Sequence, residues 1–370
     1  MKIAIVHDQL QEFGGAERVL VSLMDIFPHA DLYTAYYNPS TLGHHAEQTK
    51  KWNIHTTWAD RIPGFKRLAS PLRFLTPFIW ESINFSDYDL VISSSGTMMC
   101  KGIITRPETP HICYLHHPPR YLYYYETALE WQKHILIKIY GNLINQHLRE
   151  WDFLSSQRVD HFIANSEETK RRIQKYYRCD ADVIYPPVMI PKDLPRNTKK
   201  KNYYLTISRL ARAKHLDILI EAANKKKLPL KIVGQGRDYA YLKSLAGDTV
   251  ELVGGIPDNE LEELYAGAKA FLFASRDEEF GIAPIEAMGR GIPVIAYASG
   301  GLKETIQPGH NGYLFSTLSA DSLLEQVEIL EKTSVPEYEK LCQNARQESL
   351  KYSFEVFKKK VTDLISTFEN

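Results

Sequence analysis

Short apolar runs alternate with amphipathic helical patterns along this 370-residue chain, and this alternation constrains its fold more than any other feature. Parallel strands need crossover connections, so the alternation predicts parallel sheets with helices on both faces. In the first half we expect strands at residues 3–6, 90–93, 111–115, 162–165 and 183–185. In the second half we expect strands at residues 203–207, 230–233, 250–253, 270–273, 294–296 and 313–315.

A proline-rich and then lysine-rich stretch separates the two halves. Four prolines lie within residues 186–195, and proline cannot join a strand ladder. The polar run at residues 197–202 is expected to stay in solvent. The chain is also longer than one average domain. We therefore expect Rossmann-like, doubly wound α/β domains at residues 1–190 and 200–350, facing each other across a cleft.

The end of the chain predicts an amphipathic helix over residues 353–370. Ser353 is a suitable N-cap residue. The apolar residues that follow it fall on one helical face: Phe357, Val361, Leu364, Ile365 and Phe368.

Composition excludes several classes of protein. The formal net charge is zero, which argues against nucleic-acid binding through global charge. Four scattered cysteines without a Cys-x-x-Cys pair indicate neither a disulfide framework nor a zinc site, and they favour a reducing compartment. The sequence shows no signal-peptide pattern and no apolar run of membrane-spanning length. We expect a cytoplasmic protein, with peripheral attachment to the inner face of the cytoplasmic membrane left open.

Two glutamates separated by seven residues point to a ligand site in the second half. Glu278 follows the apolar run at residues 271–273, and Glu286 lies in a helix expected from Ala283. Open α/β sheets bind ligands beyond the carboxyl ends of their strands. Ionised carboxylates there suit a molecule rich in hydroxyl groups, such as a nucleotide sugar. The alternative is an ordinary strand–loop–helix with a solvated Glu278 and a capping Glu286.

A second loop predicts an anion site. Arg209 and Lys214 lie between a strand that ends at Ile207 and a helix that begins near His215. Fixed cations beside a helix N-terminus suit a diphosphate, whose charge grows as a glycosidic bond breaks. Arg212 is read as a solvated extra cation, and a basic surface loop is the alternative for the whole segment.

Two loops of the first half carry further candidates. Gly14 and Gly15 follow the first strand and open a helix, where glycine permits close approach of a phosphate. Glu17 and Arg18 are left as a candidate intrahelical pair. His116 directly follows the strand expected at residues 111–115 and is next to His117. Adjacent histidines could bind a metal, but the sequence has no third ligand at suitable spacing, so we expect no metal site there.

Four motifs resemble one known family, in its order and over nearly the whole chain. The string Glu278-x-Phe280-Gly281-x-x-Pro284-x-Glu286 resembles the Glu-x7-Glu motif of the retaining glycosyltransferases of family 4, which have the GT-B fold. The other three matching strings are Ser208-Arg209-Leu210 with Lys214, Gly14-Gly15-Ala16-Glu17-Arg18, and His116-His117-Pro118-Pro119-Arg120-Tyr121.

The resemblance implies a role for each matching residue. Glu286 binds the ribose of the donor, Glu278 with the amides of Phe280 and Gly281 binds the sugar, and Arg209 and Lys214 stabilise the diphosphate. The complete implied set is as follows: catalytic His116, Glu278, Arg209 and Lys214; donor-binding Gly14, Gly15, Arg209, Lys214, Gly234, Glu278, Phe280, Gly281, Ile282 and Glu286; acceptor-binding Gly15, His116, Arg120 and Tyr121.

The resemblance also implies a reaction and partners. The last helix is expected to cross back to the first domain. No metal or cofactor is expected. The Asp-x-Asp strings at residues 87–89 and 180–182, which could hold a metal in other proteins, look like turns that lead into strands. The His-x-Pro-x-Arg-Tyr element favours mannose transfer from GDP-mannose to a lipid-linked or oligosaccharide acceptor in surface polysaccharide or O-antigen synthesis. A UDP-sugar or deoxysugar donor is the alternative. A GT-B epimerase or phosphorylase, or a non-catalytic sugar-binding relative, is more remote.

One segment leaves a membrane contact open. Residues 58–80 mix cations with large apolar groups, as segments at a membrane surface do. Prolines break it into short pieces, so a loop-rich part of the first domain is an equal alternative. The tyrosines at residues 121–125 are expected either to stack on sugars or to pack.

Overall fold

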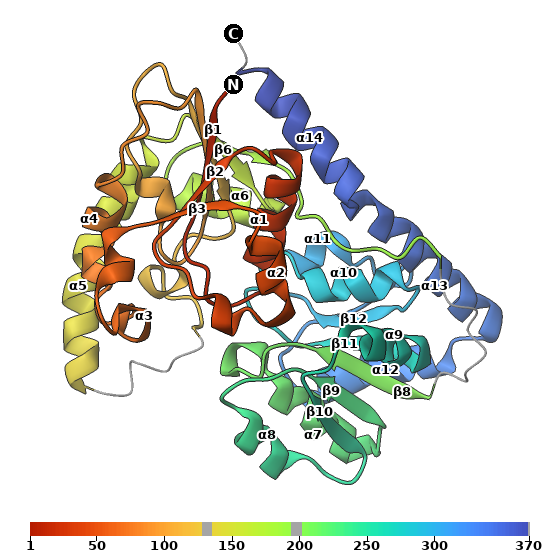
Figure 1. Ribbon diagram of the computed structural model, residues 1–370. Coiled ribbons are helices and arrows are strands. Elements are labelled where there is room, and N and C mark those ends of the chain that lie inside the picture. Colours follow the sequence, from red (N-terminus) through yellow and green to blue (C-terminus); the bar gives the residue numbers. More distant parts are fainter. Residues whose placement is uncertain (128–134, 194–201, 369–370) are drawn as a thin grey trace. The chain divides into compact units, whose positions relative to one another are not determined.

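The chain forms two compact units (Figure 1). The computed structural model describes residues 1–127, 135–193 and 202–368. The first unit comprises Met1–Tyr125, the described residues from Ile135 to Pro187, and the described residues from Phe354 on. The second comprises the described residues of Val188–Ser353, together with Glu126 and Thr127.

The first unit contains a seven-stranded parallel sheet with the order β3-β2-β1-β4-β5-β6-β7. The strands are β1 Ile3–His7, β2 Asp31–Thr34, β3 Asn53–Thr56, β4 Leu90–Ser95, β5 His111–Leu115, β6 His161–Ala164 and β7 Asp182–Val183. The sequence did not predict β2 and β3, and β7 is shorter than expected. The order reverses between β1 and β4, which is where such sheets bind ligands.

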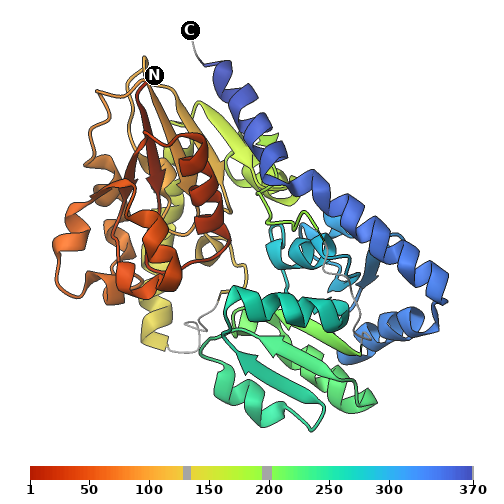
Figure 2. The ribbon, with the colours of Figure 1, turned by 45° about the vertical axis from the view of Figure 1, so that its right-hand side comes forward.

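Helices cover this sheet, and the last helix of the chain is one of them. The longer helices are α1 Gly15–Ile26, α5 Ile135–Ser156, α6 Glu167–Tyr176 and α14 Phe354–Ser366. The short ones are α2 Ala46–Thr49, α3 Phe65–Leu68 and α4 Thr76–Glu81. Phe357, Val361 and Ile365 of α14 are buried in one core with residues of α1, β1 and β4. Figure 2 shows α14 at the end of the chain. The predicted packing of the last helix on the first domain is therefore confirmed.

The second unit contains a six-stranded parallel sheet with the order β10-β9-β8-β11-β12-β13. The strands are β8 Tyr203–Ile207, β9 Leu230–Val233, β10 Val250–Gly254, β11 Ala268–Phe273, β12 Val294–Tyr297 and β13 Gly312–Phe315. The helices are α7 Leu216–Lys226, α8 Tyr239–Leu245, α9 Asp258–Gly267, α10 Ile282–Gly289, α11 Leu302–Thr305, α12 Ala320–Lys332 and α13 Val335–Ser349. Here the order reverses between β8 and β11, so the loops that follow these two strands are neighbours.

Candidate functional site

The structure brings Lys214 and Glu278 together in the second unit. The Lys214 Nζ atom lies 2.6 Å from Glu278 Oε2. Ser275 Oγ donates to the same carboxylate oxygen at 2.6 Å. Lys214 follows β8 and Glu278 follows β11, and their side chains are 20% and 17% exposed. A cation and an anion are thus paired at the switch point of the sheet, where both are accessible to solvent.

The loop after β12 binds the backbone at Asp277 and Glu278. Gly301 N donates to the Glu278 carbonyl oxygen at 2.9 Å, and Ser299 Oγ accepts from Asp277 N at 2.9 Å. Gly300 has φ +57°, and a Cβ atom there would lie 1.9 Å from the same carbonyl. Because only glycine fits, the Gly300–Gly301 pair fixes the backbone that carries Glu278.

Glu286 projects from α10 on the side away from the core. Pro284, Ile285 and Ala287 are buried, whereas Glu286 and Ile282, one turn apart on the same face, are partly exposed. Phe280 is 3% exposed and its ring packs on Tyr352 at a centroid distance of 5.2 Å. A ligand can therefore meet Phe280 only through its backbone.

The loop after β8 carries the exposed Arg209 and lies against the loop after β9. Gly234 has φ +142°, and a Cβ atom there would lie 1.9 Å from the Ser208 carbonyl oxygen. Arg212 is exposed, as expected of a solvated cation, and it also has partners on the surface. Its Nε lies 3.3 Å from Asp238 Oδ2, and its guanidinium carbon lies 3.6 Å from the Tyr241 ring centroid.

In the first unit, the side chain of Glu17 folds back onto the glycine loop that opens α1. Glu17 Oε2 accepts from Gly14 N at 2.8 Å, and α1 begins at Gly15. Glu17 Oε1 also lies 3.6 Å from His7 Nε2. Glu17 therefore serves the loop and the end of β1 rather than only its own helix.

His116 directly follows β5 and is 8% exposed. Its Nε2 lies 2.8 Å from Ser94 Oγ, and its carbonyl oxygen accepts from Asn165 Nδ2 at 2.9 Å. Ser94 Oγ in turn lies 3.0 Å from His7 Nδ1. Neither His7 nor Ser94 was predicted from the sequence, although both lie at or near the ends of the strands that flank the switch point.

Arg120 and Tyr121 lie in a short 3-10 turn after His116 (Arg120–Leu122). Tyr121 Oη donates to the Thr97 carbonyl at 3.3 Å, so the turn is anchored near β4. Of the nearby tyrosines, Tyr123 stacks on Tyr176 at 4.0 Å, whereas Tyr124 is 83% exposed. Packing therefore accounts for Tyr123.

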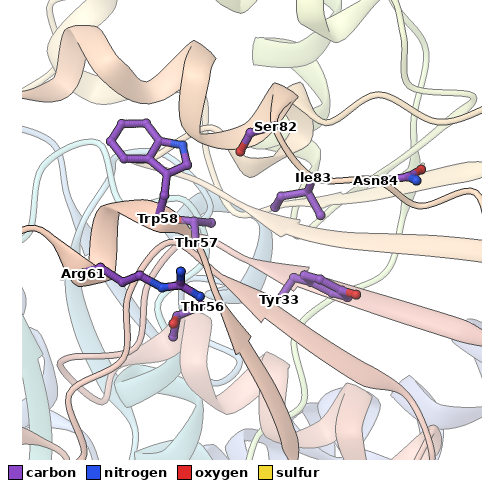
Figure 3. A pocket seen from close by; sticks show the side chains of 8 residues that line it. All are labelled: Tyr33, Thr56, Thr57, Trp58, Arg61, Ser82, Ile83 and Asn84. Atoms are coloured by element: carbon purple, nitrogen blue, oxygen red, sulfur yellow. The ribbon is translucent and has the colours of Figure 1, made fainter.

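A pocket of about 440 Å³ lies elsewhere in the first unit, beside the edge strand β3 (Figure 3). It is lined by Tyr33, Thr56, Thr57, Trp58, Arg61, Ser82, Ile83 and Asn84. None of the predicted site residues lies in it.

The segment at residues 58–80 forms short helical pieces, as its prolines predicted. Phe65 and Trp80 are buried in the core, whereas Phe78 and Leu68 are 66% and 51% exposed. Among the helices that the structure describes, none is both long and apolar enough to cross a bilayer. Across the same residues, no group of three side chains suited to bind a metal converges.

Both units match family models. Residues 13–190 match the model described as Glycosyltransferase Family 4, and residues 191–348 match Glycosyl transferases group 1. The GtfA subunit of a UDP-N-acetylglucosamine–peptide N-acetylglucosaminyltransferase from Streptococcus pneumoniae is 27% identical over 75% of this chain and 55% of its own length. The chain thus spans little more than half of that relative. An alpha-1,3/1,6-mannosyltransferase from Schizosaccharomyces pombe is 24% identical over 85% of this chain and 70% of its own length.

Solved structures share the fold. HepE of Anabaena, crystallised with UDP and glucose, superimposes with a TM-score of 0.73 and 20% identity, over 99% of both chains. Sucrose-phosphate synthase from Thermosynechococcus elongatus gives a TM-score of 0.76 and 17% identity, also over 99% of both chains. These neighbours confirm the predicted GT-B fold.

Proposed function

The chain belongs to glycosyltransferase family 4, and we propose that it is a retaining hexosyltransferase that uses a nucleotide-sugar donor. The observation that carries the proposal is the Lys214–Glu278 pair, 2.6 Å apart at the switch point of the second sheet. A cation there suits the diphosphate, and a carboxylate beside it suits the hydroxyls of the attached sugar.

The remaining donor contacts follow from the positions of the loops. Arg209 would share the diphosphate with Lys214, while Glu286 and Ile282 would face the nucleoside from one side of α10. Gly234 would let the backbone of its loop approach the base closely. Gly14 and Gly15 would do the same for the phosphates, and Arg120 and Tyr121 would border the acceptor with His116.

Retention requires that the new bond form on the face that the diphosphate leaves. In the proposed step, the bond between the anomeric carbon and the diphosphate oxygen breaks. The acceptor oxygen then bonds that carbon from the same side, and its proton passes to the departing phosphate oxygen. Lys214 stabilises the charge that develops on that phosphate, and Glu278 orients the sugar without attacking it.

Mannose from GDP-mannose is the donor we propose first. The His116–Tyr121 element supports this choice, as does the similarity to a mannosyltransferase over 85% of this chain. A UDP-sugar is the second candidate, because another relative is named for UDP-N-acetylglucosamine. Both donors require the same diphosphate and sugar contacts.

A lipid-linked acceptor is supported by an exposed apolar surface on the first unit. On α5, Ile135, Ile139 and Leu143 recur at helical spacing and are 75%, 55% and 68% exposed. Tyr140 Oη donates to the Pro71 carbonyl, so α5 contacts the segment that also carries the exposed residues Leu68 and Phe78. We propose that this surface meets the membrane that holds the acceptor.

Thermal stability with ligands tests the proposed function. The protein, without added metal, is heated with GDP, UDP, dTDP, ADP and their sugar conjugates, because a ligand of the folded state raises the midpoint. Stabilisation by GDP and GDP-mannose is expected, and stabilisation by UDP species would select the second donor. A response to none of these nucleotides would contradict transfer from a nucleotide sugar. Donor turnover without any acceptor would instead indicate an epimerase or a hydrolase.

A further inference from the structure

The pocket beside β3 takes no part in the proposed transfer step. Its volume of about 440 Å³ falls within the range of small-molecule sites. Its lining comes from β2, from the end of β3 and the turn that follows, and from the loop between α4 and β4. Figure 3 shows these side chains around one space. The pocket is therefore built from three separate segments of the first unit.

One wall of the pocket is held by contacts within the protein. Thr57 is buried, and its hydroxyl donates to the Ala35 carbonyl oxygen at 2.8 Å. The Tyr33 ring stacks on His55 at a centroid distance of 4.7 Å, and Tyr33 Oη lies 2.9 Å from Tyr88 Oη. Because none of these contacts needs a ligand, the wall is formed before a ligand arrives.

Three side chains of the lining keep hydrogen-bond donors that no described residue uses. Arg61 is exposed and forms no ion pair or hydrogen bond with the parts of the chain that the structure describes. The Asn84 amide oxygen accepts from Ser86 N at 3.0 Å, which leaves the Nδ2 group for a ligand. The Thr56 hydroxyl has no described partner either. Since no aspartate or glutamate lines the pocket, these donors suit a ligand that accepts hydrogen bonds and carries negative charge.

The acidic residues that flank Arg61 in the sequence are held by other cations. Asp60 Oδ1 lies 2.8 Å from Lys66 Nζ, and Glu81 Oε1 lies 2.7 Å from Arg158 Nη1. The charge of Arg61 is therefore not neutralised locally. One guanidinium balances the single charge of a carboxylate, whereas a phosphate monoester carries about −1.5 to −2. The pocket thus favours a carboxylate over a phosphate monoester.

Trp58 gives the pocket an apolar surface. Part of its ring packs on the apolar core of the first unit, and its Nε1 lies 3.5 Å from the Phe78 carbonyl oxygen. The rest of the half-buried ring lines the pocket. An aromatic face packs against the C–H groups of a sugar ring, while the hydroxyls of the sugar reach the polar groups around it.

We propose that this pocket binds a hexuronate, an anionic sugar unit with one carboxylate. The carboxylate meets Arg61, the ring packs on Trp58, and the hydroxyls accept hydrogen bonds from Asn84 and Thr56. The source of such a unit rests on the proposed function, in which a glycan is the acceptor. The pocket would then hold the acceptor glycan at a second point, in addition to the transfer site.

Binding can be measured on the full chain labelled with ¹⁵N-tryptophan. The chain has five tryptophans, and a Trp58→Phe variant identifies the Trp58 indole signal. Methyl glucuronide and methyl galacturonide are titrated beside methyl glucoside and methyl galactoside, which carry a hydroxymethyl group in place of the carboxylate. We expect at least one uronide to shift the Trp58 signal and to bind about tenfold or more tightly than its neutral counterpart, since the neutral sugar lacks the charge-assisted bond. Equal affinity within both pairs, or no shift with any of the four sugars, would overturn the proposal.

Two variants of the lining and one control locate the ligand. Arg61→Gln should weaken uronide binding about tenfold or more. Asn84→Asp keeps the acceptor for Ser86 N but replaces the donor with a negative charge, so it should abolish uronide binding and weaken the neutral sugars much less. Arg67→Gln, at an exposed cation of the same segment that does not line the pocket, should bind as wild type does. Wild-type affinity for the uronide in either lining variant would overturn the proposal, and if one variant does not fold, the other carries the test.

Sodium phosphate and sodium acetate separate a sugar site from a bare anion site. The contact with the Trp58 ring should make the uronide bind about fivefold or more tightly than either ion. An ion that binds as tightly as the uronide would overturn the proposal. None of these titrations involves a donor or turnover. A wild-type protein inactive with every nucleotide sugar would therefore refute the proposed function, while the titrations would still decide whether the pocket binds a hexuronate.

Discussion

Lys214 is partly exposed and paired with Glu278, so its charge is held in place before any ligand arrives. A diphosphate would bring it a second, stronger anionic partner as the bond to the sugar breaks. We predict that Lys214→Ala lowers kcat about 100- to 1000-fold, the range found when one donor to a developing oxyanion is removed. Steady-state kinetics with the stabilising donor measure this change.

Arg212→Ala is the control for that loss. Arg212 lies two residues away in the same 3-10 turn, but it pairs with Asp238 and lies over Tyr241. Its removal changes the local charge by the same amount without touching the Glu278 pair, so kcat should stay within about threefold of wild type. Equal losses in both variants would show that the effect is general electrostatics and not the assigned contact.

His111 makes stability depend on pH. Its ring is fully buried, and burial, helped by the nearby Lys101 charge, lowers its pKa to about 3. Below about pH 6.5, His111 binds a proton in the unfolded chain but stays neutral in the folded chain. The full contribution of the neutral ring to the free energy of unfolding is therefore present above that pH. This contribution is lost as the pH falls toward 3, at about 1.4 kcal/mol per pH unit.

Urea denaturation between pH 7.5 and 5 measures this dependence for wild type and for His111→Gln. We expect a shallower loss of unfolding free energy with falling pH in the variant, since glutamine does not titrate and can still bond Ser93, whose Oγ lies 2.8 Å from His111 Nε2. His29→Gln, at an exposed histidine, should keep the wild-type slope. Parallel slopes for wild type and His111→Gln would refute the assignment.

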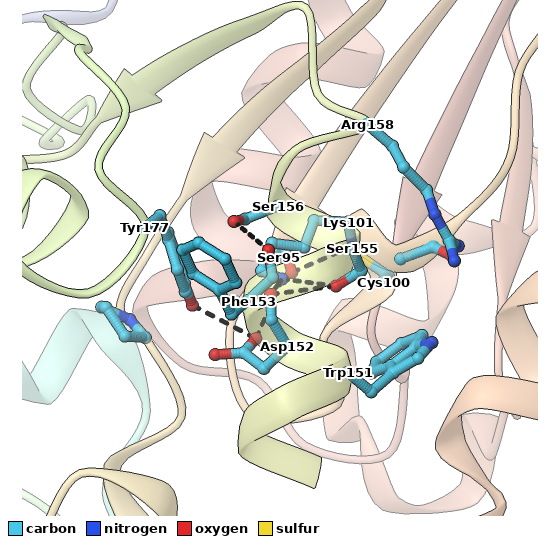
Figure 4. A network of polar contacts seen from close by, with 12 residues as sticks. Ser95, Cys100, Lys101, Trp151, Asp152, Phe153, Ser155, Ser156, Arg158 and Tyr177 are labelled. Carbon is cyan, nitrogen blue, oxygen red and sulfur yellow. Dashed lines mark hydrogen bonds and ion pairs between the residues drawn. The ribbon is translucent and has the colours of Figure 1, made fainter. Parts of the chain in front are cut away.

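At the scale of elements, a buried ion pair ties α5 to the turn after β4 (Figure 4). Lys101 Nζ lies 2.9 Å from Asp152 Oδ1, and their side chains are 1% and 0% exposed. Tyr123 and Tyr177 donate to the same carboxylate at 2.6 Å and 3.2 Å. Removing one of the two charges leaves the other buried and unpaired, which is unfavourable.

We predict that Lys101→Met lowers the free energy of unfolding by about 3–5 kcal/mol. Replacing both partners, as Lys101→Met with Asp152→Asn, should recover part of that loss because no unpaired charge stays buried. Lys225→Met is the control, since the Lys225–Asp321 pair is exposed, and it should cost no more than about 1 kcal/mol. Urea denaturation distinguishes these cases. A loss in the double variant as large as in Lys101→Met would contradict this account.

The sequence predicted the strands of the second sheet well, but it missed two adjacent strands at one side of the first sheet. β8 and β9 were predicted to the residue, because both are apolar runs bounded by turn residues. β2 and β3 were missed, because each has only four residues and β3 has no buried residue. A short strand that is partly in solvent has the composition of a loop, and only its pairing with a neighbouring strand reveals it.

The candidate site divides in the same way. Glu278, Lys214 and Gly281 belong to local strings, so the sequence could single them out. The chain His7–Ser94–His116 could not be predicted, because the register of three strands brings together residues 87 and 22 positions apart. Spacing along the chain carries no trace of such a contact.

At the scale of the whole molecule, charge is balanced overall but not locally. The formal net charge is zero, yet Arg61 and Arg67 are exposed in the segment that carries Leu68 and Phe78, and Lys138 precedes Ile139 on α5. No carboxylate of the described residues lies within ion-pair distance of Arg67 or Lys138. Cations beside exposed apolar side chains suit binding to a bilayer with anionic headgroups, because the cations attract the headgroups and the apolar side chains insert.

We predict that the protein binds phosphatidylglycerol-containing vesicles more strongly than phosphatidylcholine vesicles, and that salt weakens the binding because screening acts on the cations. Ile139→Ser with Leu143→Ser should reduce binding at all salt concentrations, and Arg67→Glu should reduce it mainly at low salt. The matched control is Ile329→Ser with Val335→Ser, at side chains of the second unit that are 47% and 71% exposed. Vesicle co-sedimentation measures all of these. Equal binding by both double variants would place the contact elsewhere, and binding to neither vesicle would refute it, since apolar side chains that meet a bilayer contribute wherever they insert.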